Sequence, residues 1–212
     1  MADNEEEKEE MTEDQIKKQE LYESLDMPLL FDKYDMKEVE VKDRGLKKYI
    51  NLLPILLPHS GGSHANKRFG KEEVSIIERV INNMMKTEEY TGKKTKAYNT
   101  VRDAMDIIHE KTEQNPVEVL VRAIENTSPR EETTRITYGG ISVPKAVDVS
   151  PARRISHSLQ NITKGAVKAS YKNKNDIAAC LADELMKASK NDKNSFAISK
   201  KEEIERMAQS AR

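Results

Sequence analysis

A glycine-centred ribbon in the middle of the chain most constrains its fold. Two segments rich in β-branched residues, Thr133–Tyr138 and Ile141–Val149, flank the pair Gly139-Gly140. Two adjacent glycines suit a two-residue hairpin turn, which requires positive φ at both central positions. The pattern predicts an antiparallel β-hairpin at about residues 133–149.

The expected turn also sets the register of the ribbon. Tyr138 should face Ile141, and Ile136 should face Val143, which gives the ribbon one apolar side. Pro144 should lie on the other side, and it cannot donate to a strand ladder, so its strand must be an edge. A ribbon of two strands is marginally stable alone in water, so another part of the chain must hold it.

The rest of the chain has helical periodicity. Apolar residues recur at i, i+3 and i+4 spacing, and nothing repeats at a fixed longer period. We therefore predict a mainly α protein, a bundle of about six helices with one protruding two-stranded β-hairpin. The expected core positions, helix by helix, are Ile76, Ile77, Val80, Ile81, Met84 and Met85; Ala97, Val101, Ala104, Met105 and Ile108; Val117, Leu120, Val121 and Ile124; Ile155, Leu159, Ile162 and Ala166; and Ile177, Leu181, Leu185 and Ala188.

Several helix starts carry recognisable capping residues. Asn115-Pro116 and Ser150-Pro151 place an N-cap residue before proline at the first helical position. Ser199 with Glu202 fits a capping box for a last helix through Met207. Near the beginning of the chain, Thr12 with Gln15 fits the same device for a short helix to about Leu25.

Composition divides the chain into three parts. Residues 1–11 form an acidic segment without apolar periodicity, which we expect to be disordered. Residues 12–58 should be an extension with a short helix and irregular structure, since its prolines prevent a long helix. Residues 59–212 should form the helical domain with the hairpin arm.

The charge is distributed unevenly. Residues 1–41 hold 15 acidic and 5 basic residues, whereas the remainder holds 31 basic and 22 acidic ones. An acidic head on a basic body suggests a polyanionic partner, although a solvated tail before an ordinary charged domain is an equal alternative. The single Cys180, with no apparent signal peptide or membrane span, favours a reducing, cytoplasmic setting.

Basic residues concentrate at the ends of the expected elements. Arg153 and Arg154 are the most informative, because cations in the first turn of a helix oppose its dipole unless an anion docks there. Tyr171 offers a stacking surface among lysines. A converging set of such residues would form one basic, phosphate-binding face, and its candidates are Lys67, Arg68, Lys71, Lys93, Lys94, Lys96, Arg130, Arg153, Arg154, Lys164, Lys168 and Lys172.

The sequence offers no catalytic or metal site. Gly92-Lys93-Lys94-Thr95 lacks the first glycine of a phosphate loop, because Thr87 stands there. His59 and His64 have no acid or cysteine at a known ligand spacing. Cys180 lies among alanines, as a buried structural thiol would. We expect no enzyme, no cofactor and no metal.

Six motifs in order resemble the family of small ribosomal subunit protein seven, in its archaeal and eukaryotic form. They cover about residues 50–212, and residues 12–49 resemble the extension of archaeal members. The motifs are PHSGG with KRF (Pro58 to Phe69), TGKKTKAYNTV (Thr91 to Val101), QNPVEVLVRAIENTSPREETTRITYGG (Gln114 to Gly140), VDVSPARR (Val147 to Arg154), ACLADEL (Ala179 to Leu185) and AISKKEEIERMAQSAR (Ala197 to Arg212).

The resemblance implies a primary RNA-binding protein that binds the 3′ major domain of small-subunit ribosomal RNA and initiates assembly of the head. It implies neighbouring head proteins and platform protein eleven as partners, with the arm near the exit-site tRNA and the mRNA path. Neither a membrane nor a homo-oligomer is expected. Gln160 stands where relatives often carry a basic residue, so it is not counted as a phosphate contact. The arm positions implied are Arg135, Tyr138, Gly139, Gly140 and Lys145.

Two other classes of function stay open on the residues alone. One is a non-ribosomal helical RNA-binding protein, such as a translation regulator that uses the same basic face. The other is a protein–protein scaffold whose acidic tail or hairpin docks a partner.

Overall fold

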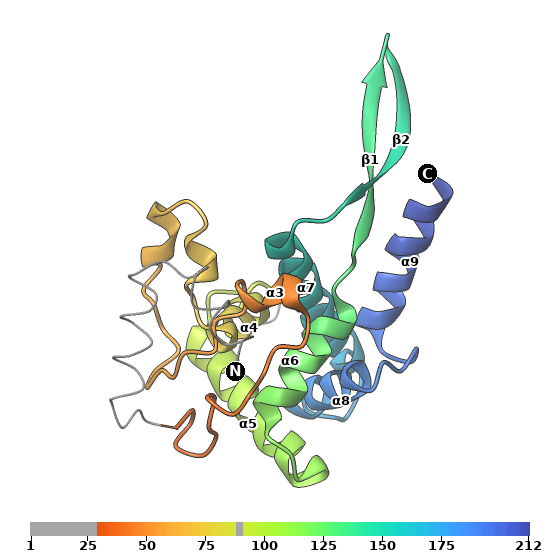
Figure 1. Ribbon diagram of the computed structural model, residues 1–212. Helices are drawn as coiled ribbons and strands as arrows, with labels where there is room; N and C mark the ends of the chain where they lie inside the picture. Colours follow the sequence, from red (N-terminus) through yellow and green to blue (C-terminus); the bar gives the residue numbers. More distant parts are fainter. Residues whose placement is uncertain (1–28, 88–90) are drawn as a thin grey trace, which may run out of the picture.

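The computed structural model describes residues 29–87 and 91–212, and it is a helical bundle from which one β-hairpin projects (Figure 1). This architecture confirms the predicted fold class. No helix in these ranges is long and apolar enough to cross a membrane. The described elements are α3 (Arg44–Lys47), the 3-10 helices η1 (Ser63–Asn66) and η2 (Gly70–Glu72), α4 (Ile76–Met84), α5 (Lys94–Thr112), α6 (Pro116–Thr127), β1 (Glu131–Tyr138), β2 (Ile141–Asp148), α7 (Pro151–Ser170), α8 (Ile177–Ser189) and α9 (Phe196–Ser210).

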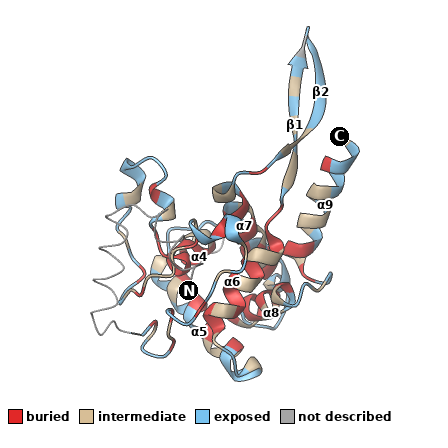
Figure 2. Cartoon of the chain, in the orientation of Figure 1, coloured by how far each residue is buried: buried red, intermediate tan, exposed pale blue. Residues whose placement is uncertain are grey.

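Helix α8 is the centre of the bundle, since it packs against α5, α6 and α7. Its inward face combines Leu181 and Leu185 with small residues such as Ala178 and Ala182, all buried. Small side chains let neighbouring helices approach closely, and the leucines fill the space between them. Figure 2 shows buried residues throughout the bundle and largely exposed residues on the hairpin. All the predicted core positions are buried except Met85, which packs partly buried against the core.

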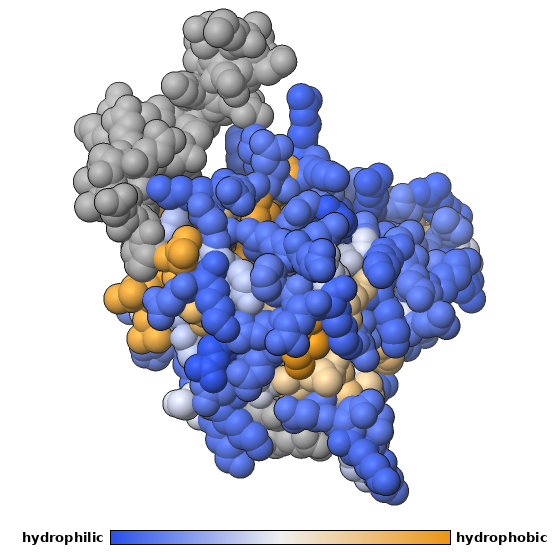
Figure 3. Space-filling view, turned by 90° about the horizontal axis from the view of Figure 1, so that it is seen from below, coloured by the Kyte–Doolittle hydropathy of each residue, from blue (hydrophilic) through white to orange (hydrophobic). Residues whose placement is uncertain are grey.

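The surface reflects the high charge content of the sequence. Charged residues make up 34% of the chain. Figure 3, which views the molecule from below, shows a mostly hydrophilic face with hydrophobic residues confined to small spots.

The helix starts agree with the sequence in part. Asn115 caps α6 as predicted, with its side-chain oxygen accepting from the backbone N–H of Val117. Ser150 precedes α7, but its side chain makes no capping bond. The predicted start of the last helix at Ser199 was wrong, because α9 begins at Phe196 with Ser195 as its N-cap.

Glu184 explains the earlier start of α9. Its buried Oε1 accepts hydrogen bonds from Ser195 Oγ at 2.8 Å and from the backbone N–H of Ala197 at 2.9 Å. These two bonds fix the first turn of α9 on α8. Ser199 therefore lies inside the helix, and its hydroxyl donates to the carbonyl of Lys193.

The segment 29–50 is more ordered than its irregular sequence suggests. It adds side chains to the main core, including the fully buried Leu30, Met36 and Leu46. It also contains α3, a short helix that the sequence analysis did not predict; it starts after Asp43, whose carboxylate accepts from the Gly45 N–H. The predicted helix from Thr12 to about Leu25 lies outside the described residues.

The hairpin has the predicted turn and register. Gly139 and Gly140 have φ of 56° and 85°, as a two-residue hairpin turn requires. Ile136 pairs with Val143 across the antiparallel ladder. Strand β1 begins at Glu131, two residues nearer the base than predicted, and β2 ends at Asp148, one residue before the predicted end at Val149.

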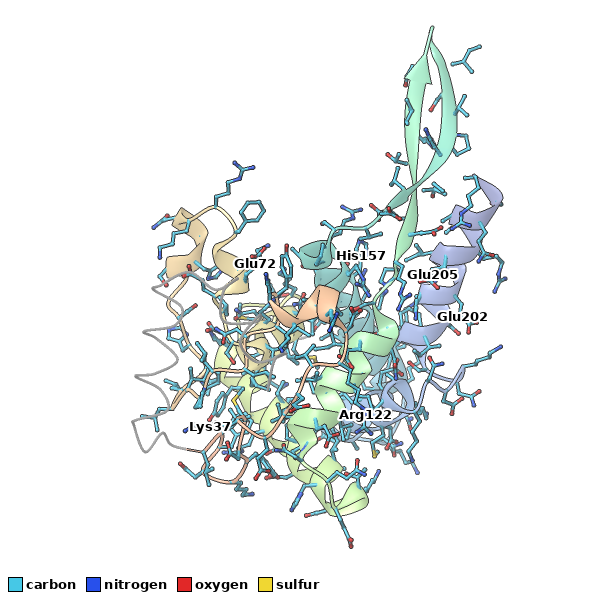
Figure 4. All side chains as sticks on the ribbon, in the orientation of Figure 1. Lys37, Glu72, Arg122, His157, Glu202 and Glu205 are labelled. Carbon is cyan, nitrogen blue, oxygen red and sulfur yellow. The ribbon has the colours of Figure 1, made fainter. Side chains whose placement is uncertain are left out.

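Helix α9 supplies the support that the ribbon needs. It packs against both strands, and Glu205 Oε1 accepts from the backbone N–H of Arg130 at 3.0 Å (Figure 4). The Ala146 N–H donates to the carbonyl of Ala211 at 3.3 Å. Arg212 forms an ion pair with Glu131. The base of the ribbon is thus braced, while its tip projects away from the described helices (Figure 1).

Replacing Gly165 of α7 with alanine should destabilise the protein. An added Cβ would lie 3.0 Å from both the Glu184 carboxyl and Phe196 Cβ. Neither neighbour can move aside without loss. Glu184 is held by two hydrogen bonds from Ser195 and Ala197, and Phe196 lies between these two residues in the chain. Overpacking of this kind costs about 1–3 kcal/mol, which should outweigh a helix-propensity gain of at most about 1 kcal/mol.

The measurement is urea denaturation of Gly165→Ala beside wild type. Ser156→Ala, at an exposed position of the same helix, is the matched control and should change the free energy of unfolding by less than about 0.5 kcal/mol. An unchanged or raised stability of Gly165→Ala would show that the contact between α7, α8 and α9 is looser than described.

Candidate nucleic-acid interface

The first group of predicted cations lies on the loop between residues 59 and 73. Lys67, Arg68 and Lys71 are all exposed on the turns of η1 and η2. Arg68 lies over the ring of Phe69, with its Cζ 5.1 Å from the ring centroid. Lys67 Nζ approaches Glu73 Oε2 at 3.6 Å, but both side chains are well exposed. An exposed pair of this kind contributes little, so Lys67 can exchange partners readily.

A buried carboxylate joins this loop to the start of α5. Glu78 Oε1 accepts from the Ser60 N–H at 2.9 Å, from Ser60 Oγ at 3.0 Å and from Lys94 Nζ at 2.9 Å. Burial raises the pKa of Glu78, but the hydrogen bonds and charge of Lys94 and the bonds from Ser60 outweigh it, so the net pKa is lowered. Lys94 is thereby held inward, next to the exposed Lys93 and Lys96.

The second group surrounds the base of the hairpin. Arg153 Nε lies 2.9 Å from Glu132, and Arg154 lies 2.8 Å from Asp43. Burial raises the pKa of Asp43, but the bonds from Arg154 and the Gly45 N–H bring it below its usual value. The anions at the start of α7 in this structure are therefore carboxylates of the chain itself.

These two arginines differ in exposure. The side chain of Arg153 is 56% exposed, whereas that of Arg154 is 11% exposed. Arg153 can exchange Glu132 for another anion at a small energetic cost. Arg154 can bind another anion only if its part-buried pair with Asp43 is broken. Arg130 is exposed nearby, and its charge also lowers the pKa of Asp43.

The third group follows α7 toward its end. Lys164 and Lys168 are exposed one turn apart, and Lys172 follows the helix with φ of 55°. Lys168 Nζ lies 4.3 Å from the ring centroid of Phe196, and Lys172 Nζ lies 5.3 Å from that of Tyr171. The Tyr171 side chain is exposed, as a stacking surface requires.

The arm carries its cations on opposite sides. Arg135 pairs with Pro144 and Lys145 with Thr134, so the two-residue period puts Arg135 and Lys145 on different sides of the ribbon. Both are exposed. Gly139 and Gly140 form the tip, and Tyr138 ends β1 beside them; its side chain lies outside what the structure describes.

The structure thus divides the predicted residues into available and engaged cations. Engaged cations are Lys94 and Arg154, which are held by buried or half-buried carboxylates, and Arg153 and Lys67, which have exposed pairs. Within the described ranges, the predicted cations that are exposed and have no carboxylate within 4.0 Å are Arg68, Lys71, Lys93, Arg130, Arg135, Lys145, Lys164, Lys168 and Lys172.

Sequence reasoning missed the residues that position these cations. Glu78 and Asp43 each bind a cation far away in the chain, and local spacing carries no signal of such a pair. Phe69 was also missed as a surface residue, although an aromatic side chain between Arg68 and Lys71 is a visible signal of stacking.

Chemistry of other kinds finds no support among the described residues. No group of three or more histidine, cysteine, aspartate or glutamate side chains there could hold a metal ion. Cys180 is buried, and burial together with Asp183 and Asp176 raises the pKa of its thiol, which disfavours the reactive thiolate.

Comparison with known proteins identifies similar chains. Residues 46–212 match the model of the family "Ribosomal protein S7p/S5e". The small ribosomal subunit protein uS7 of Thermoplasma volcanium is 58% identical over 184 residues, which is 87% of this chain and 100% of that protein. The uS7 proteins of Methanothermobacter thermautotrophicus and Archaeoglobus fulgidus are 56% and 53% identical, each over 87% of this chain and over 100% and 95% of their own lengths.

Neutralising Glu78 should weaken the fold in a pH-dependent way. Glu78→Gln removes a buried charge that Lys94 and Ser60 require, which should lower the free energy of unfolding at pH 7 by about 1–3 kcal/mol. Because the folded-state pKa of Glu78 is lowered, its contribution is present at neutral pH and is lost as the pH falls below about 4.3, the ordinary value for glutamate.

Urea denaturation at pH 7 and at pH 3 measures this effect, and the difference between wild type and Glu78→Gln should shrink at the lower pH. Glu73→Gln, which removes only an exposed pair with Lys67, is the control and should change little at either pH. A deficit of Glu78→Gln that is equal at both pH values would contradict the ionic account.

Proposed function

The chain belongs to the ribosomal protein S7p/S5e family, in its archaeal form, and on that premise we propose that its exposed cations bind the 3′ major domain of small-subunit ribosomal RNA and initiate assembly of the subunit head. The observation that supports this proposal is the set of exposed lysines and arginines of the bundle that have no carboxylate partner among the described residues. They lie on the 59–73 loop, before α5, at the base of the hairpin, and on and after the second half of α7. The basic residues named above stay predictions as individual RNA contacts.

The broader role follows from the family. The relatives are structural proteins of the small ribosomal subunit, so this chain is a structural constituent of that subunit in the cytoplasm. The prediction that it is not an enzyme is confirmed on the same ground.

Rigid positioning is the physical basis of the proposed binding. Each phosphate that a lysine or arginine neutralises releases condensed counterions, and this release favours binding. Ordering long basic side chains costs entropy, and the cost falls when the loops that carry them are already fixed. The contacts of Glu78 with Ser60 and Lys94 fix two such loops before RNA arrives.

Recognition of this kind reads the shape of the RNA. The candidate cations lie on separate loops and helix ends, so they match phosphates of a folded junction rather than base edges along one groove. Arg153, whose pair with Glu132 is largely exposed, is proposed to exchange that carboxylate for phosphate. Arg154 is proposed to act chiefly through its pair with Asp43, which sets the start of α7.

The arm is proposed to serve a different purpose from the bundle. Its tip projects away from the helices (Figure 1), and Arg135 and Lys145 place one cation on each side. Because its base is held by α9 and its tip projects outward, the hairpin can extend beyond the RNA domain that the bundle is proposed to bind. We place it near the exit-site tRNA, the mRNA path and platform protein eleven, with head proteins beside the bundle.

Removing exposed cations should lower the salt dependence of RNA binding. For a transcript of the 3′ major domain, log affinity should fall linearly with log salt, and each of Lys71→Ala and Lys93→Ala should reduce the slope by roughly 0.7–0.9. Filter binding across salt concentrations measures it. Lys111→Ala is the matched control, since Lys111 lies in the last turn of α5, at the opposite end of that helix from Lys93, and should leave the slope unchanged. A wild-type slope near zero would defeat the proposal.

Shortening the arm should separate RNA binding from function on the ribosome. Deleting residues 135–138 and 141–144 joins Thr134 to Gly139 and Gly140 to Lys145. The two-glycine turn then connects Thr134 and Lys145, which already pair in the ladder. Affinity for the RNA domain should stay within about twofold, because the arm base and its α9 contacts remain. Translation by subunits reconstituted with the variant should be impaired, and a large loss of RNA affinity would show that the arm is part of the primary interface.

A further inference from the structure

A hollow of about 470 Å³ separates the 59–73 loop from the start of α7. Its lining includes Lys67, Phe69, Lys71, Glu72, Arg79 and Ser156. Its volume falls within the range of about 300–1,000 Å³ typical of small-molecule sites. Its lining includes Lys67 and Lys71, which are proposed RNA contacts. Whatever occupies the hollow should therefore be part of the same RNA.

Phe69 is held in this hollow at some cost. Its side chain is 64% exposed, and its φ of 61° is a left-handed conformation that is unfavourable for a bulky residue. Strained residues of this kind are concentrated at functional sites. The next residue, Gly70, is buried so tightly that an added Cβ would clash with the His64 carbonyl oxygen. The turn is therefore built to present Phe69, although water is a poor partner for its ring.

The surroundings of the ring are cationic. Arg68 covers one face of Phe69, which leaves the other face for a second partner. Lys67 and Lys71 stand on the rim, and the buried Arg79 adds positive charge at the floor, where its Nη1 donates to the Tyr49 carbonyl at 3.2 Å. An aromatic face among lysines and arginines suits a base with its attached phosphate.

Polar groups in the hollow lack partners of their own. Within the described ranges, His64 Nδ1 is buried without a hydrogen bond. Glu72, labelled in Figure 4, makes no side-chain hydrogen bond there and interacts only with the charge of Arg79. A carboxylate at this place can accept from the amino group of a base.

We infer that this hollow binds a single unstacked nucleobase of the ribosomal RNA, with Phe69 as its stacking surface and Lys67 and Lys71 on the adjoining phosphate. The inference rests on the proposed function and adds a base contact to an interface otherwise made of phosphate contacts. A protein side chain is the less suitable occupant. A nucleotide offers both a flat base for the Phe69 ring and a phosphate for the lysines, whereas a single protein side chain does not offer both.

Binding of the 3′ major domain transcript by full-length variants tests the inference. Phe69→Ala should lower the affinity about 5- to 150-fold, which corresponds to the 1–3 kcal/mol of one base–aromatic stack, with no change in salt slope. Phe69→Tyr keeps the ring and should bind nearly as well as wild type. Leu57→Ala, at another exposed apolar position of the neighbouring loop, is the matched control and should bind normally.

The outcomes separate this inference from the proposed function. If wild type binds the transcript and Phe69→Ala matches it within twofold, the nucleobase site is overturned while the RNA-binding function stands. If wild type fails to bind at all, both fall. A photoreactive phenylalanine at position 69 of assembled subunits should crosslink to RNA; a crosslink to a protein would overturn the inference. Thermal melting of each variant checks that the fold is unchanged.

Discussion

The bundle depends on the close packing of α8 against three other helices. Its small residues, Ala178 and Ala182 among them, bring α5, α6 and α7 near enough for their leucines, isoleucines and valines to exclude water. The candidate RNA contacts lie on the outside of this block. The basic loops and the arm can be polar and irregular because α8 organises the core, to which the 29–50 segment adds Leu30, Met36 and Leu46.

Buried and half-buried carboxylates connect the outside elements to that block. Glu184 fixes α9 on α8, Glu78 fixes the basic loop beside α5, and Asp43 joins the 29–50 segment to α7. Each carboxylate is compensated by hydrogen bonds, as a buried charge must be. One consequence is a difference among the cations: Lys94 and Arg154 complete the fold through these carboxylates, whereas a larger set stays exposed.

The hairpin is a marginally stable element that another part of the chain supports at one end. Two strands alone do not hold their shape in water, yet α9 covers the base through Glu205 and the Ala146–Ala211 bond. The tip receives no such support from the residues that the structure describes. An arm that is anchored at one end and open at the other can occupy a narrow site whose walls are supplied by other molecules.

The sequence by itself determined the helices, the hairpin and its register, because the apolar period, the proline-marked starts and the Gly139-Gly140 turn are local properties. It also located the basic segments. Only the tertiary structure decided which cations stay available: Arg153 and Arg154 are neighbours in sequence, yet one faces outward and the other pairs inward with Asp43. The start of α9 at Phe196 and the presentation of Phe69 were likewise beyond local pattern. Each depends on contacts between residues far apart in the chain, and the energy of such a contact exists only once the fold brings them together.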